Sequence, residues 1–178
     1  DAEVQRVERK TKLCNIKWLT DDNEEIIITT TRPELICACG VVVVHPDDKR
    51  YLHLIGKNIN LPLSVNNRVN NVKILSHPSV KMDFGSGVLM VCSFGDQNDV
   101  AIFRELGLKP FQAIDLEGKM TSISGDLSGL LVKDARNLAI EILNKEGKID
   151  SISDHIQEIP VSERGNNPIE IILLKEWY

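Results

Sequence analysis

The chain has 178 residues, of which 42% are apolar and 26% are charged, and this composition is typical of one globular domain with a sizeable core. The formal net charge of −5 excludes a general electrostatic attraction to phosphate backbones. An aromatic content of 4% also argues against broad base-stacking platforms. Any nucleic-acid contact is therefore expected to involve only a short end of the nucleic acid, or to depend on another molecule that brings the two together.

The sequence contains no apolar run long enough to cross a membrane, and its charged beginning, DAEVQRVERK, does not resemble a signal peptide. We therefore expect a cytoplasmic protein with no membrane partner. The cysteines lie in apolar stretches without C-x-x-C spacing, and they are Cys14, Cys37, Cys39 and Cys92. This pattern predicts reduced core thiols rather than zinc ligands or disulfides.

The first half of the chain predicts mainly strands. In chain order we expect a hairpin of 12–19 and 24–31 around TDDN, a buried strand at 39–45, a short helix within 45–56, and short strands and loops over 57–80. Asp47 is the expected N-cap of the short helix and Gly56 its stop.

The second half predicts two longer helices. We expect a buried strand at 85–93, a helix at 95–107, a hairpin around the Glu-Gly turn of FQAIDLEGKMT, a helix at 132–146 with apolar residues at helical spacing, and a last strand in PIEIILLKEWY. Asp96 lies near the start of the first helix and Gly107 ends it. The expected fold is a single α/β domain with a β core and about three peripheral helices.

A run of threonines ends the second strand of the first hairpin. Thr29, Thr30 and Thr31 are β-branched and suit a strand. Because strand side chains alternate, their hydroxyls must lie on both faces, although one face is expected to pack on a core. The run therefore calls for a role beyond packing.

Two acids open the helix at 95–107. Asp96 and Asp99 are three residues apart and share one face near the helix N-terminus. Capping explains Asp96 as well as function does, whereas Asp99 better fits a carboxylate that binds a ligand ammonium group. Gly85 and Gly87 allow close backbone approach, which predicts contact with a substrate, or unusual φ angles. No motif for a P-loop, a nucleophile elbow or a metal centre is present, so neither a metal nor a cofactor is expected and any chemistry must work through positioned water.

Five segments together resemble one family in one order: TTTRPEL, VVVVHPDDKRY, FGSGVLMVCSFGDQNDV, GLLVKDARNLAIEILNKEG and PIEIILLKEWY. They are similar to the editing (CP1) domain inserted into class I aminoacyl-tRNA synthetases for branched aliphatic amino acids, and FGDQNDV and PIEII favour the valyl, archaeal-like type. The resemblance covers about Val7 to Tyr178, and it implies that the core of this α/β domain is mixed and β-barrel-like. No HIGH or KMSKS signature is present, so residues 1–178 are expected to be a single editing domain, excised from a larger synthetase and monomeric in isolation.

The resemblance implies hydrolysis of threonine from mischarged tRNA(Val), and an activity on threonyl-adenylate as an extension. It implies that Thr29, Thr30 and Thr31 line the site beside the terminal adenosine and the ester, and that Arg32 binds the adenosine phosphate or orients the loop. Asp99 matches the acid that binds the α-ammonium, and Asp96 matches a position that reads the threonine hydroxyl. The partners implied are the 3′ acceptor end of tRNA(Val) and the rest of the parent synthetase.

Three points stay open at this level. Glu34 fits either a functional or a solvent-facing residue. Met90 stands where related domains often carry a lysine, while Ser162 and Gly165 replace the cysteines of a C-x-R-C knuckle and remove the basis for zinc. The alternatives for the whole chain are an isoleucyl- or leucyl-type editing domain, or a non-catalytic module that only binds the acceptor end.

Overall fold

The computed structural model describes residues 4–162. The predicted strand in PIEIILLKEWY and Gly165 lie outside the described residues. Within this range the strands are β1 (Val4–Thr20), β2 (Glu25–Thr30), β3 (Cys39–Val44), β4 (Asn58–Asn60), β5 (Asn71–Ser76), β6 (Val88–Cys92) and β7 (Ile149–Ser162). The helices are α1 (Gln97–Glu105) and α2 (Val132–Lys145), with 3-10 turns η1 (Pro33–Ala38), η2 (Leu52–Leu54) and η3 (Ser122–Leu127).

The predicted first hairpin is confirmed. β1 and β2 pair antiparallel, with Cys14 opposite Thr30 and Leu19 opposite Glu25. The turn uses Asn23 at φ +65°, a conformation that asparagine tolerates better than most residues. β1 continues toward the N-terminus and pairs with β7, a long strand that the sequence does not predict because its serines and acids imitate a loop. Since Val4 pairs with Ser162, the two ends of the described part lie side by side.

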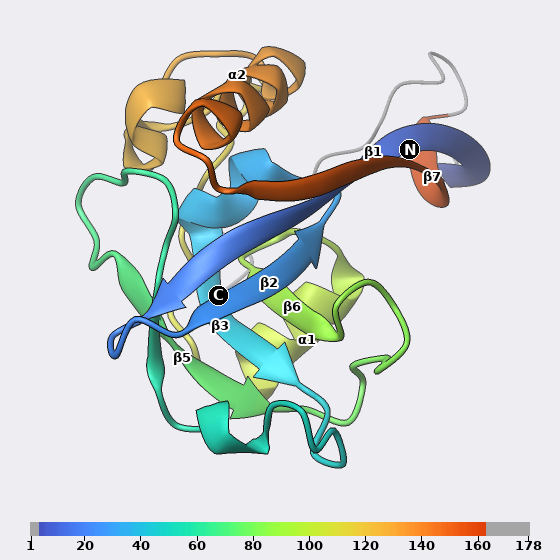
Figure 1. Cartoon of the computed structure of the whole chain (residues 1–178). Helices are drawn as coiled ribbons and strands as arrows, with labels where there is room; N and C mark the ends of the chain where they lie inside the picture. The colour runs from blue at the N-terminus through green and yellow to red at the C-terminus, as the bar shows by residue number, and fades with distance from the viewer. Residues whose placement is uncertain (1–3, 163–178) are drawn as a thin grey trace.

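The strands form one curled sheet. Their order is β2-β1-β4-β5-β3-β6, with β7 added on β1. The two end strands, β2 and β6, nevertheless lie against each other, so the sheet almost closes into a barrel (Figure 1). This confirms the predicted mixed, barrel-like core. Among the described strands no β-ladder joins β2 to β6, and we call the boundary between Thr29–Arg32 and Gly85–Gly95 the seam.

The core is mainly apolar. Large apolar side chains in it with less than 2% exposure include Ile16, Trp18, Ile28, Ile36, Leu54, Ile59 and Ile74. α1 packs outside the barrel, where Ile102 and Phe103 cover Val41 and Val43 of β3. Gly40 lies beneath the Phe103 ring, and a Cβ there would overlap it. This packing fixes the position of α1, whose first turn carries two of the predicted site residues.

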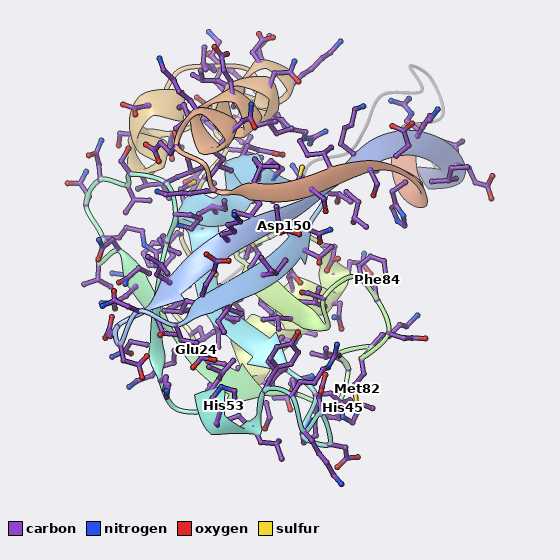
Figure 2. All side chains as sticks on the ribbon, viewed as in Figure 1. Glu24, His45, His53, Met82, Phe84 and Asp150 are labelled. Carbon is purple, nitrogen blue, oxygen red and sulfur yellow. The ribbon has the colours of Figure 1, made fainter. Side chains whose placement is uncertain are left out.

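The predicted helix within 45–56 is wrong. This segment is a series of tight turns with only the 3-10 turn η2 inside it. Asp47 caps no helix; instead, Asp48 accepts from the backbone N–H of Arg50 at 3.2 Å and binds its guanidinium. Local side-chain bonds of this kind compete with helical backbone bonds. Figure 2 shows His53 of this segment beside Glu24, at 2.7 Å between Nε2 and Oε2.

The other predicted elements agree with the structure. α1 and α2 occupy the two predicted helices, and β3 and β6 the two predicted buried strands. The hairpin predicted at FQAIDLEGKMT is reduced to one antiparallel bridge between Ile114 and Met120, with Gly118 at φ +79° in its turn. No helix in the part of the chain that the structure describes is long and apolar enough to span a membrane.

Candidate functional site

Thr29 joins the two sides of the seam. It is only 2% exposed. Its hydroxyl donates to Oδ1 of Asn15, the residue opposite it on β1, at 2.6 Å, and accepts from the backbone N–H of Ser86 at 2.9 Å. A hydroxyl has one proton to donate. Ser86 Oγ also lies 3.3 Å from this hydroxyl, so the shorter contact assigns the Thr29 proton to Asn15, and this side chain fastens β2 to the turn before β6.

Thr30 and Thr31 keep hydrogen-bonding capacity. Both are partly exposed. The Thr30 hydroxyl accepts from the backbone N–H of Arg32 at 3.0 Å, which leaves its proton available. Within residues 4–162 the Thr31 hydroxyl makes no hydrogen bond. These two hydroxyls are therefore free to contact a ligand at the end of β2.

Arg32 reaches across the other end of the seam. Its Nη1 donates to the backbone oxygen of Gly95 at 3.4 Å, and its Nε donates to Oε2 of Glu34 at 3.1 Å. The side chain retains 22% exposure. A guanidinium that is held in place and partly exposed is well suited to an anion or a carbonyl oxygen.

Glu34 is completely buried, which excludes the solvent-facing interpretation. Arg136 of α2 binds both of its oxygens, with distances of 3.0 Å from Nε and 2.8 Å from Nη2. Burial raises the pKa of Glu34, but the Arg136 hydrogen bonds and the charge of Arg32 outweigh that effect and lower it overall. Glu34 is thus an anion between two guanidinium groups, and it connects α2 to the arginine at the seam.

Asp96 is the N-cap of α1. Its Oδ1 accepts from the backbone N–H of Asp99 at 2.8 Å, and the side chain is exposed. The capping interpretation is confirmed. Because the carboxylate is exposed, its predicted contact with a ligand hydroxyl stays a prediction.

Asp99 lies inside the turn that Asp96 caps. Its Oδ2 accepts from the backbone N–H of Cys92 at 3.1 Å, and a Cβ on Gly95 would stand 2.5 Å from the same oxygen. Burial and then the charge of Asp96 raise the pKa of Asp99 to about 8, although the Cys92 hydrogen bond and Arg32 oppose the shift. Without a ligand the carboxyl is mainly protonated at neutral pH. A cation bound beside it would favour its charged form.

Gly85 and Gly87 have φ angles of +55° and +82°, as the unusual-φ prediction requires. A Cβ on Gly85 would overlap the Thr29 side chain, and one on Gly87 would stand 2.7 Å from Nη2 of Arg50. The close approach at both glycines is thus made by the protein's own side chains. Their predicted contact with a substrate stays a prediction.

The structure therefore divides the predicted residues into two groups along the seam. Arg32 meets the turn that carries Asp96 and Asp99, while Thr29 meets the turn of Gly85 and Gly87. Thr30 and Thr31 connect the groups through the chain. The sequence analysis did not identify Arg136, Asn15 or Ser86. Their contacts join elements that are distant in sequence, and no local motif indicates them.

Among the described residues, no three side chains of His, Cys, Asp or Glu lie close enough together to hold a metal ion. The four cysteines are buried and free. Met90 is buried in β6 opposite Val42, so it contributes to the core.

Solved structures share this fold. A crystal structure described as GlLeuRS-CP1 matches with a TM-score of 0.63 over 80% of this chain and 99% of that chain, at 12% sequence identity. The chain thus has the CP1 fold, a mixed and nearly closed β-barrel with few helices.

Sequence relatives give the particular family. The chain is 42% identical over 178 residues to a valine–tRNA ligase of Methanocaldococcus jannaschii, covering 99% of this chain and 20% of that protein. Valine–tRNA ligases of Aeropyrum pernix and Nanoarchaeum equitans are also 42% identical, over 82% and 100% of this chain. No protein-family model matches the chain. This chain is homologous to a segment of archaeal valine–tRNA ligases, and it spans about a fifth of their length.

Proposed function

We propose that this chain is the editing domain of a valine–tRNA ligase and hydrolyses the ester of threonine on the 3′-terminal adenosine of tRNA(Val). The observation that carries the proposal is the meeting of Arg32 with the Asp96–Asp99 turn beside the free hydroxyls of Thr30 and Thr31. These groups supply a cation, an ammonium-binding carboxyl and hydroxyl donors at one end of the seam.

The need for such a domain follows from the size of the amino acids. Threonine and valine are nearly isosteric, and an apolar synthetic pocket separates them only ~100-fold, a value established for valyl-tRNA synthetases. A second site that hydrogen-bonds the threonine hydroxyl gains discrimination, because valine leaves its polar groups unpaired. The exposed carboxylate of Asp96 suits that contact.

Each residue then has a defined task. Asp99 binds the α-ammonium, and Arg32 binds the phosphate of the terminal adenosine. Thr30 and Thr31 donate to the ester carbonyl or hold the attacking water, together with the substrate's vicinal ribose hydroxyl. The water oxygen bonds to the carbonyl carbon, the bond to the ribose oxygen breaks, and that oxygen takes a proton. The rate enhancement comes from positioning and fixed dipoles, without a covalent intermediate.

The test is deacylation of Thr-tRNA(Val) and Val-tRNA(Val) by the isolated chain and by a valine–tRNA ligase that contains it. We expect threonine to be released from tRNA(Val) well above the spontaneous rate by the full ligase, with valine spared. A spontaneous rate with the full ligase would contradict the proposal and favour a module that only binds the acceptor end. The same assay with threonyl-adenylate tests the extension to the activated amino acid.

A further inference from the structure

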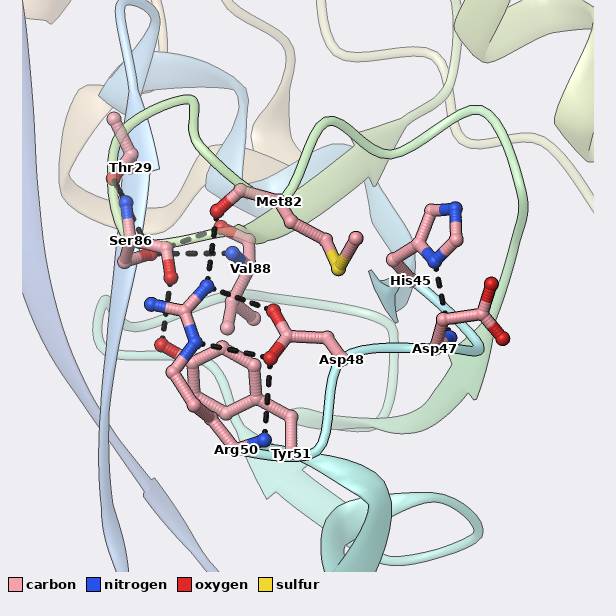
Figure 3. Close-up of polar contacts among 9 residues, drawn as sticks. All are labelled: Thr29, His45, Asp47, Asp48, Arg50, Tyr51, Met82, Ser86 and Val88. Carbon is pink, nitrogen blue, oxygen red and sulfur yellow. Dashed lines mark hydrogen bonds and ion pairs between the residues drawn. The ribbon is translucent and has the colours of Figure 1, made fainter.

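The turn before β6 is held from the side opposite the candidate site. Residues Met82–Gly87 form this turn, and the Ser86 backbone N–H donates to Thr29 across the seam at 2.9 Å. The Ser86 backbone oxygen accepts from the hydroxyl of Tyr51 at 2.6 Å. One peptide segment is therefore fixed on one side by Thr29 and on the other by Tyr51 (Figure 3).

Tyr51 is itself held by an ion pair. Oδ1 and Oδ2 of Asp48 accept from Nε and Nη2 of Arg50 at 3.0 and 2.8 Å, and Nη2 also donates to the Met82 backbone oxygen at 2.9 Å. The guanidinium carbon lies 4.9 Å from the centre of the Tyr51 ring. Asp48 is only 4% exposed. The Asp48–Arg50 pair thus contacts both the start of the turn and the ring that reaches its middle.

The Tyr51 hydroxyl keeps its proton in this setting. Burial raises the pKa of the phenol above its ordinary value, although the nearby Arg50 opposes the shift. The group therefore acts as a neutral donor to Ser86 throughout the physiological range. Phe84 of the same turn makes an edge contact with His155 of β7, at 5.8 Å between ring centres, which fixes the turn at a third point.

We infer that Tyr51 is a positioning residue for the editing reaction, which it serves by holding Ser86 against Thr29 and so setting the seam beside Thr30 and Thr31. The inference rests on the proposed function. Because the Thr29 proton is assigned to Asn15, Thr29 acts here as the link between the Ser86 backbone and the end of β2, while the hydroxyls of Thr30 and Thr31 contact the substrate.

The experiment uses Tyr51→Phe in a valine–tRNA ligase that contains this chain. The variant deletes one oxygen and keeps the ring beneath Arg50. Thr121→Val is the matched control, since Thr121 also donates a hydroxyl to a backbone oxygen at 2.6 Å, that of Gln112, and takes no part in the Tyr51–Ser86–Thr29 contacts. We expect kcat for Thr-tRNA(Val) deacylation to fall ~5- to 10-fold in Tyr51→Phe, the size of one lost hydrogen bond, with KM within twofold. Thr121→Val should retain the original kcat.

A second readout separates this inference from the proposed function. Amide hydrogen exchange at Ser86 in the isolated chain should accelerate ~5- to 10-fold or more in Tyr51→Phe and stay unchanged in Thr121→Val. A normal kcat, or unchanged Ser86 exchange, in Tyr51→Phe would overturn the inference. Loss of kcat in both variants would also overturn it, because the effect would then be general destabilisation. Absence of deacylation by the unsubstituted ligase would instead overturn the proposed function, and Ser86 exchange would still decide whether Tyr51 holds the turn.

Discussion

Asp99 differs from an ordinary aspartate in its charge state at neutral pH. Its pKa of about 8 means that the free protein holds a neutral carboxyl at the start of α1. A ligand ammonium beside it would draw off the proton and leave an ion pair. Ligand entry is therefore coupled to proton release, and the empty site avoids an unpaired charge in a partly buried position.

The first prediction concerns stability. The folded chain keeps the Asp99 proton up to about pH 8, whereas an unfolded chain loses it near pH ~3.9. Between these values the folded state binds more protons, so this residue's contribution to stability falls as pH rises. Asp99→Asn cannot ionise. As the pH rises from 4 to 8, the melting temperature of Asp99→Asn should therefore rise relative to that of the original chain, and calorimetry measures this difference. A difference that does not change with pH would contradict the buried environment assigned to Asp99. Glu34 titrates in both proteins, so its contribution to the pH dependence of stability cancels in the comparison.

The second prediction concerns catalysis. In the full ligase, Asp99→Ala should reduce Thr-tRNA(Val) deacylation more than ~10-fold, the scale of one charge-assisted hydrogen bond. Asp99→Asn should recover little, because it keeps the shape without the charge. Asp96→Ala should instead reduce discrimination between threonine and valine more than it reduces the overall rate.

Valine charging by the same enzyme preparations, with melting curves, is the control. Normal deacylation in Asp99→Ala would show that this acid only supports the helix start.

At the scale of elements, α2 is tied to the site through one buried carboxylate. Arg136 binds both oxygens of Glu34, and Glu34 in turn binds Arg32. Removing one partner of a buried ion pair typically costs ~3–5 kcal/mol, because an uncompensated charge stays buried. Arg32 remains beside Glu34 here, which favours the lower end of that range.

The third prediction follows from this arrangement. Arg136→Gln should lower stability by ~3 kcal/mol, or roughly 6–12 °C in melting temperature for a domain of this size. Lys133→Gln, on the exposed face of α2, should change stability by less than ~0.5 kcal/mol. The double variant Arg136→Gln, Glu34→Gln should recover part of the lost stability, because the buried charge of Glu34 is then removed as well. Failure of the double variant to recover would contradict the ion-pair explanation.

Elements with a clear local pattern were predictable from sequence. α2 follows from apolar residues at helical spacing, and β3 from a continuous apolar run bounded by turn residues. The segment 45–56 was not predictable as turns, because the decisive Asp48–Arg50 pair looks like ordinary helix-surface charge. β7 was missed since its pairing with β1, rather than its composition, makes it a strand. In the site, Thr29–Arg32 and Asp99 came from motifs, whereas Arg136 needed the packing of α2.

For the whole molecule, charge limits how it meets tRNA. The net charge of −5 gives no long-range attraction to a polyanion. The fourth prediction is that the isolated chain binds tRNA(Val) weakly, with affinity falling as salt rises. A small adenosine analogue carrying threonine should bind with little salt dependence, because it presents the terminal group without the phosphate chain. Fluorescence titration at two salt concentrations measures both, and tight tRNA binding at physiological salt would contradict the prediction.

The lack of a ladder across the seam has an evolutionary consequence. Among the described residues, Thr29 and Arg32 join the end of β2 to the segments that flank β6 through their side chains, so replacing one of them changes the seam without removing a ladder hydrogen bond from the sheet. Mutations that adapt the seam to another ligand would therefore be partly uncoupled from those that preserve the barrel. A domain built in this way can diverge toward new substrates in small steps, each within the narrow stability margin that natural proteins have.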